Sequence, residues 1–520
     1  MKTSYAILKK RNLFLICLSL IAIGLSLSKP LVALGQYGLF ALWLFDGNIK
    51  EKVTSFFRNK TALTLTLIYI LSLIGLLYTE DFSFAINDLR RKLPLFSLPF
   101  LIVGFSPITK KEFALIFKYY TVGILISTFW STFILLGGTS EVITDTRALS
   151  RFNSHIRFGL EICLAIFGAI YFTWKSLTTK SKTIWSFISV WLVLFLFLSN
   201  LFTGVVILFS TSIILLSIYS IKSKKTWIKY SFFLISTSLV IISILTLKES
   251  LNSYYEETTP IKPITHTESG TKYTYDNTSI RQYDKENGYL IWSNIAWKEL
   301  ELEWNKKSTI SFSGKDLKGQ ILSTTLIRFL TSKGIYKDGE AIKNLTKEEI
   351  TAIEQGIPNR KFLNMNGIEK RIYEIIWEHD NYLQGRDFNG HSVIMRWEYW
   401  KTAFHIIKQN LFFGVGTGDL AEAFKTQYEL DNTTLKPQYQ LRAHNQYITF
   451  AVAFGILGLL VFGFSLIYPI IKQKMFNNYF YLSFLCIILL SMLSEDTLET
   501  QIGITFFAFF NTIFLLKEKN

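Results

Sequence analysis

Histidine and arginine residues stand at the edges of apolar segments in this sequence, and their types and spacing point to one kind of chemistry. His444 comes directly before an apolar run, and Arg442 lies two residues earlier. A neutral imidazole is a common general base near neutral pH. A guanidinium group suits phosphate and keeps its charge when partly buried. The pair indicates proton removal beside bound phosphate, although His444 could instead hydrogen bond to a backbone carbonyl at a membrane interface.

Two more segments carry the same residue types. Arg151, His155 and Arg157 come just before or within the start of another apolar run, and Arg396 lies in an aromatic-rich stretch further along the chain. Ionisable side chains at the ends of membrane helices are functional candidates by default. Each arginine taken alone could equally anchor a lipid headgroup, and we favour that role for Arg90-Arg91-Lys92.

A glycine-rich stretch, Phe413-Gly-Val-Gly-Thr-Gly-Asp419, separates Arg396 from Arg442. A Gly-x-Gly pattern can cradle phosphate where it follows a strand and opens a helix. Here it follows residues 392–409, whose apolar spacing predicts an amphipathic helix on the membrane surface or over a cavity. We therefore predict a tight turn at Gly414–Gly418 rather than a nucleotide site. The sequence also lacks a Gly-Lys-Ser/Thr loop, an Asp-x-Asp pair and zinc-ligand spacing.

The elements that position these residues follow from composition. The 520 residues are 50% hydrophobic and 18% charged, with mean hydropathy +0.29, whereas soluble domains carry roughly 25% charged residues. A spanning helix needs about 20 apolar residues. Twelve segments fit: 13–29, 30–46, 61–78, 93–107, 112–137, 155–174, 183–199, 201–219, 230–247, 446–471, 478–494 and 500–516. The first could be a cleaved signal peptide, but we favour a retained helix.

The distribution of charge gives the orientation. Residues 248–442 hold 26 basic and 26 acidic side chains, so the other 29 basic and 13 acidic residues supply the net charge of +16. With a cytoplasmic N-terminus, 21 basic residues fall in inside loops and seven in short outside loops. This asymmetry is typical of membrane proteins rather than nucleic-acid binders. The segment 93–107 contains two prolines, yet without it the later basic clusters would face outward.

The fold class is therefore an all-α polytopic membrane protein of about 12 transmembrane helices, with both termini cytoplasmic. We predict a bundle of about nine helices over 1–247, a large outside loop over 248–443 between helices nine and ten, and about three helices over 444–520. The loop lacks cysteine and so has no disulfide framework. Thr346 and Glu349 have capping-box spacing, with Gly356 ending that helix, so the loop is a mostly helical subdomain.

These motifs resemble a known family. The stretch from Arg396 to Asp419, followed by His444-Asn445-x-Tyr447 opening a helix that contains Phe454-Gly455, resembles the O-antigen ligase/polymerase superfamily of bacterial membrane glycosyltransferases. It is most similar to the O-antigen ligase-related members of Bacteroidetes. The large outside loop, the His-Asn motif and three closing spans come in the same order as in that family.

The resemblance implies a function. A glycan on undecaprenyl pyrophosphate would be transferred at the periplasmic face of the inner membrane to lipid A core, as in lipopolysaccharide biosynthesis, or to another surface acceptor. No metal, nucleotide or other cofactor would be needed. His444 would position or deprotonate the acceptor and Arg396 would act with it in catalysis. Substrate-binding residues would be Arg442, Asn445, Tyr447, Arg151, Arg157 and His155.

One departure and several alternatives remain open. Many members carry a Ser-Arg-x-Gly-like motif where this chain reads Ser199-Asn-Leu-Phe-Thr-Gly204, without the arginine. Arg151 or Arg157 would then replace it, or pyrophosphate binding is arranged differently. A polymerase that joins two lipid-carried glycans, or a ligase that modifies protein hydroxyls, would use the same chemistry. A transporter of the lipid-linked sugar fits less well, because we find no internal repeat.

Overall fold

The structure, a computed structural model, describes residues 2–139, 149–256, 258–259, 261–275, 284–386 and 388–517. Arg147 and Lys519, which were counted among the loop charges above, lie outside these ranges. The described chain is mostly helical, as predicted, and contains one short hairpin of β1 (Lys285–Glu286) and β2 (Tyr289–Leu290). It divides into two compact units: residues 1–232 with 395–520, and residues 233–394. Residues 395–443, which we assigned to the loop, pack within the first unit.

Each predicted span contains a helix, but not all of these helices are long enough to cross a membrane. Among the described residues, eight are long and apolar enough: Lys10–Leu27 within α1 (Lys2–Leu27), Lys60–Tyr78 (α4, Lys60–Ile74, with the turn Gly75–Tyr78), α7 (Lys110–Leu135), α8 (His155–Lys175), α9 (Thr179–Leu198), α10 (Phe202–Lys222), α11 (Thr226–Tyr254) and α19 (Gln446–Lys472). Three apolar helices are shorter: α2 (Lys29–Phe45), α20 (Tyr479–Ser491) and α21 (Gln501–Leu515). The proline-containing segment forms α6 (Pro94–Val103), of ten residues.

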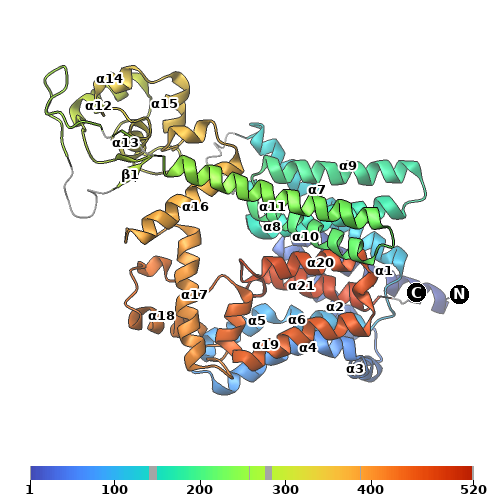
Figure 1. Ribbon diagram of the computed structural model, residues 1–520. Helices are drawn as coiled ribbons and strands as arrows, with labels where there is room; N and C mark the ends of the chain where they lie inside the picture. The colour runs from blue at the N-terminus through green and yellow to red at the C-terminus, as the bar shows by residue number, and fades with distance from the viewer. Residues whose placement is uncertain are drawn as a thin grey trace. The chain divides into compact units, whose positions relative to one another are not determined.

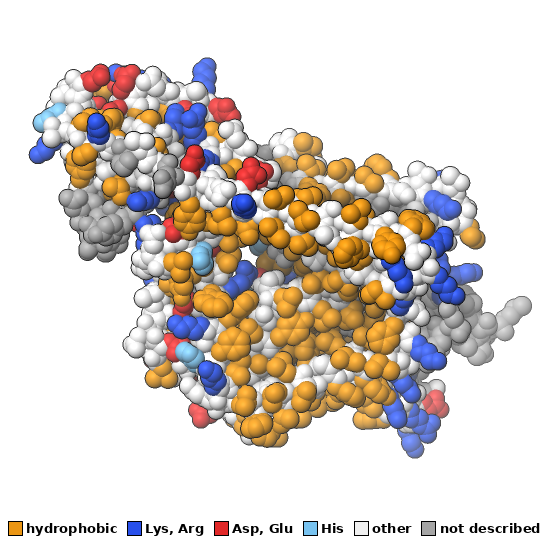
Figure 2. All heavy atoms as spheres, in the orientation of Figure 1, with side chains coloured by type: hydrophobic (Ala, Val, Ile, Leu, Met, Phe, Trp, Pro, Cys, Tyr) orange, Lys and Arg blue, Asp and Glu red, His pale blue; other side chains and the backbone are white. Residues whose placement is uncertain are grey.

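The first unit is a bundle in which N-terminal and C-terminal helices pack together (Figure 1). Helix α1 packs on α2 and α7, α4 on α19, and α6 on α21, while α20 packs on α8 and α10. Two further helices were not predicted: the amphipathic α3 (Ile49–Arg58) and α5 (Phe82–Lys92). Hydrophobic side chains cover the visible helix surfaces, and Lys and Arg gather at the end where both termini lie (Figure 2).

The second unit has its own apolar core, as expected for a folded subdomain. Its helices are α12 (Trp297–Lys307), α13 (Leu322–Ser332), α14 (Gly339–Lys343), α15 (Lys347–Glu354) and α16 (Gly367–Leu383). Fully buried Trp304, Leu326 and Ile353 belong to one cluster. Thr346 and Glu349 form the predicted capping box at the start of α15. The remaining helices, α17 (Ser392–Gln409) and α18 (Leu420–Leu430), follow in the chain, and α17 has the predicted bounds.

Helix α19 is interrupted in the middle, and the glycine-rich stretch with the residues before it forms hydrogen bonds to the backbone groups at the interruption. Gly455 has φ 62° and ψ −164°, so residues on its two sides cannot form the regular helical hydrogen bonds with one another. The amides of Ile456 and Leu457 instead donate to the carbonyls of Leu411 and Phe412. In return, the amides of residues 415 and 416 donate to the carbonyls of residues 452 and 453 at 2.9 Å. Buried backbone polar groups are costly when unpaired, so this exchange stabilises the break.

The same stretch is fastened to α4 and the segment that follows it. The Thr417 hydroxyl donates to the Ser72 carbonyl at 2.7 Å, and Asp419 accepts bonds from the amides of Glu80 and Asp81. Gly414 has φ +69°, and a Cβ there would lie 2.4 Å from the Ala453 carbonyl carbon. The stretch is therefore a structural turn, as predicted, and the amides of 415 and 416 are already engaged.

Replacing Gly455 tests the importance of the break. Gly455→Ala should lower the thermal stability of the purified protein in detergent, because a left-handed residue with a side chain costs about 1–2 kcal/mol and the added Cβ would lie 2.3 Å from the Phe412 carbonyl carbon. Gly463→Ala in the same helix is the control, since its Cβ would meet nothing within 4 Å. Equal melting temperatures for the two variants would contradict this role.

Candidate functional site

His444 occupies an unusual backbone position just before α19. Its φ is +48°, in the left-handed region that non-glycine residues seldom adopt. Such strain persists where the surrounding structure holds it in place, and it concentrates at functional sites. Trp400 on α17 donates from its indole nitrogen to the Ala443 carbonyl at 2.9 Å. The Tyr399 ring lies 5.9 Å from the imidazole ring. Helix α17 therefore holds His444 by its backbone and flanks its ring.

The residues after His444 fix the start of α19 to the end of α20. The Asn445 side chain caps α19 by accepting from the amides of Tyr447 and Ile448, and its amide group donates to the Leu493 carbonyl. The Tyr447 hydroxyl donates to the Leu489 carbonyl at 2.9 Å. Both predicted substrate-binding residues thus use polar atoms to hold the fold, which places His444 beside the connection from α20 to α21.

Three arginines and one carboxylate surround the imidazole. Burial lowers the pKa of His444, and the charges of Arg396, Arg442 and Arg157 lower it further, while the Glu495 charge opposes them. The imidazole is therefore neutral at neutral pH and can accept a proton. Within the described part of the chain, its ring nitrogens form no hydrogen bond, so a lone pair is available to a substrate hydroxyl. Four of the predicted site residues, far apart in sequence, are brought together here.

Two of the arginines form ion pairs with carboxylates in the α20–α21 connection. Arg396 pairs with Glu495 at 3.3 Å and Arg442 with Glu499 at 3.2 Å. Lys92 of α5 also contacts Glu499 at 2.9 Å, and although burial acts in the opposite direction, Lys92 and Arg442 lower the pKa of Glu499 to about 2. The lipid-headgroup role that we favoured for Lys92 is wrong, because its side chain is 4% exposed and lies between two carboxylates.

The segment before α8 contributes in part. Arg157 donates from Nε to the Thr500 hydroxyl and from Nη1 to the Ser154 hydroxyl, each at 2.7 Å. It therefore enters the site from the first turn of α8. His155 is the first residue of α8, and Arg151 is exposed in the preceding loop. Neither of these two is among the charges that act most strongly on His444.

The acidic residues of the site were missed from the sequence. Glu495, Asp496 and Glu499 lie in the short connection between α20 and α21, and Asp496 accepts a bond of 2.6 Å from the Thr449 hydroxyl of α19. A usable signal was present, because three carboxylates between two apolar runs are costly unless they are paired. Their partners could not be identified from spacing, since Lys92, which pairs with Glu499, lies about 400 residues earlier in the chain.

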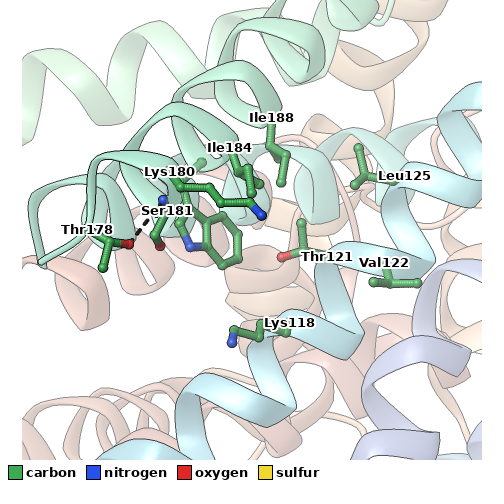
Figure 3. Close-up of a pocket in the computed structure, with 10 residues that line it drawn as sticks. Lys118, Thr121, Val122, Leu125, Thr178, Lys180, Ser181, Ile184 and Ile188 are labelled. Atoms are coloured by element: carbon green, nitrogen blue, oxygen red, sulfur yellow. Dashed lines mark hydrogen bonds between the residues drawn. The ribbon is translucent and has the colours of Figure 1, made fainter. Parts of the chain in front are cut away.

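Other features lie apart from this constellation. Helices α7 and α9 line a pocket whose wall combines Lys118 and Lys180 with apolar side chains such as Ile184 (Figure 3). None of its lining residues belongs to the predicted site. Within the described residues, no group of three or more His, Cys, Asp or Glu side chains could hold a metal ion. The chemistry available around His444 is thus a neutral base beside cationic groups that suit an anion.

Comparison with known proteins bears on the same region. No curated protein matches the chain. A protein-family model described as O-antigen ligase matches residues 352–463, which include Arg396, the glycine-rich turn, His444 and the break in α19. The match supports a ligase- or polymerase-type function in a membrane setting. It confirms the resemblance predicted from the sequence: residues 352–463 of this chain are similar to the O-antigen ligase family.

Proposed function

We propose that this protein is an O-antigen ligase-like glycosyltransferase of the bacterial inner membrane. Its donor is a glycan carried on undecaprenyl pyrophosphate, and its acceptor is lipid A core or another surface hydroxyl at the periplasmic face. The proposal rests on one observation about His444, which lies in the region that matches the O-antigen ligase family. Its imidazole is neutral and lies close enough to three arginines for their charges to lower its pKa. Anion binding and proton removal are the two tasks this transfer requires.

The transfer step assigns a role to each charge. The acceptor hydroxyl oxygen attacks the anomeric carbon, and its proton passes to a ring nitrogen of His444. The bond from that carbon to the pyrophosphate oxygen breaks, and the pyrophosphate leaves with the electron pair. Arg396 and Arg442 bind its developing negative charge through charge-assisted hydrogen bonds. The Arg396 side chain has a donor left for this role, because its buried Nε makes no hydrogen bond within the described residues.

Arg157 is suited to replace the arginine that the chain lacks after α9. Gly159 on α8 and Gly204 on α10 approach so closely that a Cβ on either would lie 3.2–3.3 Å from the other's Cα. Arg157 lies two residues before Gly159 on α8, and its guanidinium group donates to the Thr500 hydroxyl, next to Glu499 in the connection between α20 and α21. We propose that it supplies the positive charge otherwise expected from α10, and that Arg151 and His155 contact the substrate further out.

His444→Ala should abolish detectable glycan transfer, because general base catalysis contributes about 10²- to 10⁴-fold. Transfer would be measured as polymer attached to surface glycolipid on gels, with membrane abundance followed by immunoblotting. His266→Ala, at an exposed histidine of the second unit, controls for the loss of an imidazole. Wild-type transfer by a well-expressed His444→Ala protein would rule out the role of the base.

Arg396→Ala should weaken the use of donor more than the use of acceptor. Hydrogen bonds to charged groups contribute about 1.5–3 kcal/mol, so kcat/KM for the donor should fall about ten- to a hundredfold. Arg90→Ala, which removes an exposed arginine of α5, should leave kcat/KM close to the wild-type value. Equal losses for donor and acceptor would contradict a pyrophosphate contact.

Deletion of the gene in the native host should separate the candidate reactions. We expect polymer to disappear from lipid A core while long chains accumulate on the lipid carrier, because a ligase acts after the chain is built. Cores that carry a single repeat unit would instead identify a polymerase. Unchanged core and carrier fractions would exclude both of these reactions and direct the search to glycoproteins.

A further inference from the structure

Glu495 interacts with two different groups, the guanidinium group of Arg396 and the imidazole of His444. It lies in the α20–α21 connection with a side chain that is 12% exposed, and its Oε1 lies 3.3 Å from Nη2 of Arg396. Its charge is also the strongest one that favours the protonated form of His444. When Arg396 neutralises this carboxylate, less of its charge remains to stabilise a proton on the imidazole. The three side chains therefore form a coupled set rather than two separate pairs.

The strongest charges that act on His444 come from separate parts of the chain. Arg396 belongs to α17, Arg442 to the approach to α19 and Arg157 to α8, and all three favour the neutral imidazole. Glu495 alone among the strongest charges acts in the opposite direction. Asp496, its neighbour, raises the pKa of Glu495 less than burial does. Burial is the largest influence on the pKa of His444, and beyond burial the balance between the Glu495 charge and the three arginines adjusts it.

The pair between Arg396 and Glu495 is suited to exchange, whereas that between Arg442 and Glu499 is not. Arg396 makes one contact of 3.3 Å, and its side chain is 29% exposed. Glu499 is 3% exposed and has a second cation, Lys92, at 2.9 Å. An anion that binds Arg396 can therefore displace a single partly exposed contact. Displacing Glu499 from Arg442 would disrupt a buried group of charges, which costs far more free energy.

We infer that Glu495 is a positioning residue that couples donor binding to the strength of the base: it pairs with Arg396 in the empty site and turns to His444 when a pyrophosphate takes its place. This inference rests on the proposed function, since the ligand class is a polyprenyl-pyrophosphate glycan. No bond is made or broken in the exchange. Its consequence is a weak base in the empty site and a stronger base once the leaving group is bound.

Glu495→Gln in the full-length protein tests the exchange, because it keeps the shape and removes the charge. Without its carboxylate partner, Arg396 should bind undecaprenyl pyrophosphate about two- to fivefold more tightly, the range expected for loss of a partly exposed pair. The kcat for transfer from donor extracted from a deletion strain should fall about ten- to a hundredfold. A structural defect would weaken both binding and turnover, so the opposite signs are diagnostic.

The pH profile provides a second readout. An opposite charge nearby raises the pKa of an imidazole, typically by one unit or more. Loss of the Glu495 charge should therefore move the acid limb of the kcat profile about one pH unit lower. Glu495→Asp should restore part of the wild-type limb. Glu422→Gln is the control: it removes an exposed carboxylate of α18 and should leave that limb unchanged.

The outcomes separate this inference from the proposed function. If His444→Ala is inactive while Glu495→Gln binds and titrates like the wild type, the coupling role is overturned and the base role stands. If undecaprenyl pyrophosphate binds neither the wild type nor Glu495→Gln, the proposed donor class fails as well. If Glu495→Gln does not fold, Glu495→Asp takes its place in the test. Glu495→Asp should bind undecaprenyl pyrophosphate differently from the wild type. Identical binding and an identical acid limb of the kcat profile would overturn the inference.

Discussion

The cost of leaving backbone groups unpaired inside an apolar bundle governs the architecture of the site. The break at Gly455 leaves amides and carbonyls of α19 without helical hydrogen-bond partners. Backbone groups of the turn after α17 bond to them instead. The same contacts bring α17 and the first turns of α19 together. Arg396 and Trp400 on one helix then meet His444 at the end of the other. Without the break, α19 would offer no free backbone groups to the segment that follows α17, and these hydrogen bonds between the two would be lost.

Charge compensation is the second requirement, and it explains why so many ionisable groups can share a small volume. Each cation that faces His444 has an oxygen partner: Glu495 for Arg396, Glu499 for Arg442, and the Thr500 hydroxyl for Arg157. These oxygens all come from the connection between α20 and α21. One short segment therefore balances charges that come from three other parts of the chain, and through Glu495 it opposes the lowering of the His444 pKa.

Local sequence information predicted much of the fold and several residues that the structure brings together around His444. Periodicity located the helices, and capping chemistry located the start of α15 at Thr346. His444 and Arg396 could be singled out as candidates because ionisable side chains are costly at the ends of membrane helices. The carboxylate partners were not, since pairing between Lys92 and Glu499 depends on tertiary packing. Helix α20 has 13 residues where the sequence suggested 478–494, because residues 492–494 form a turn that leads into the acidic connection.

The burial of Lys92 has a consequence for how the protein is made. Helix α5 is translated about 400 residues before Glu499, which pairs with Lys92 in the folded protein. Until then, Lys92 has only Asp88, four residues before it, as a buried partner. Arg396 and Arg442 likewise gain their carboxylate partners only when the connection between α20 and α21 has been made. The charged centre therefore cannot form before this connection is translated and packed beside α5, so a chain that stalls earlier cannot complete it.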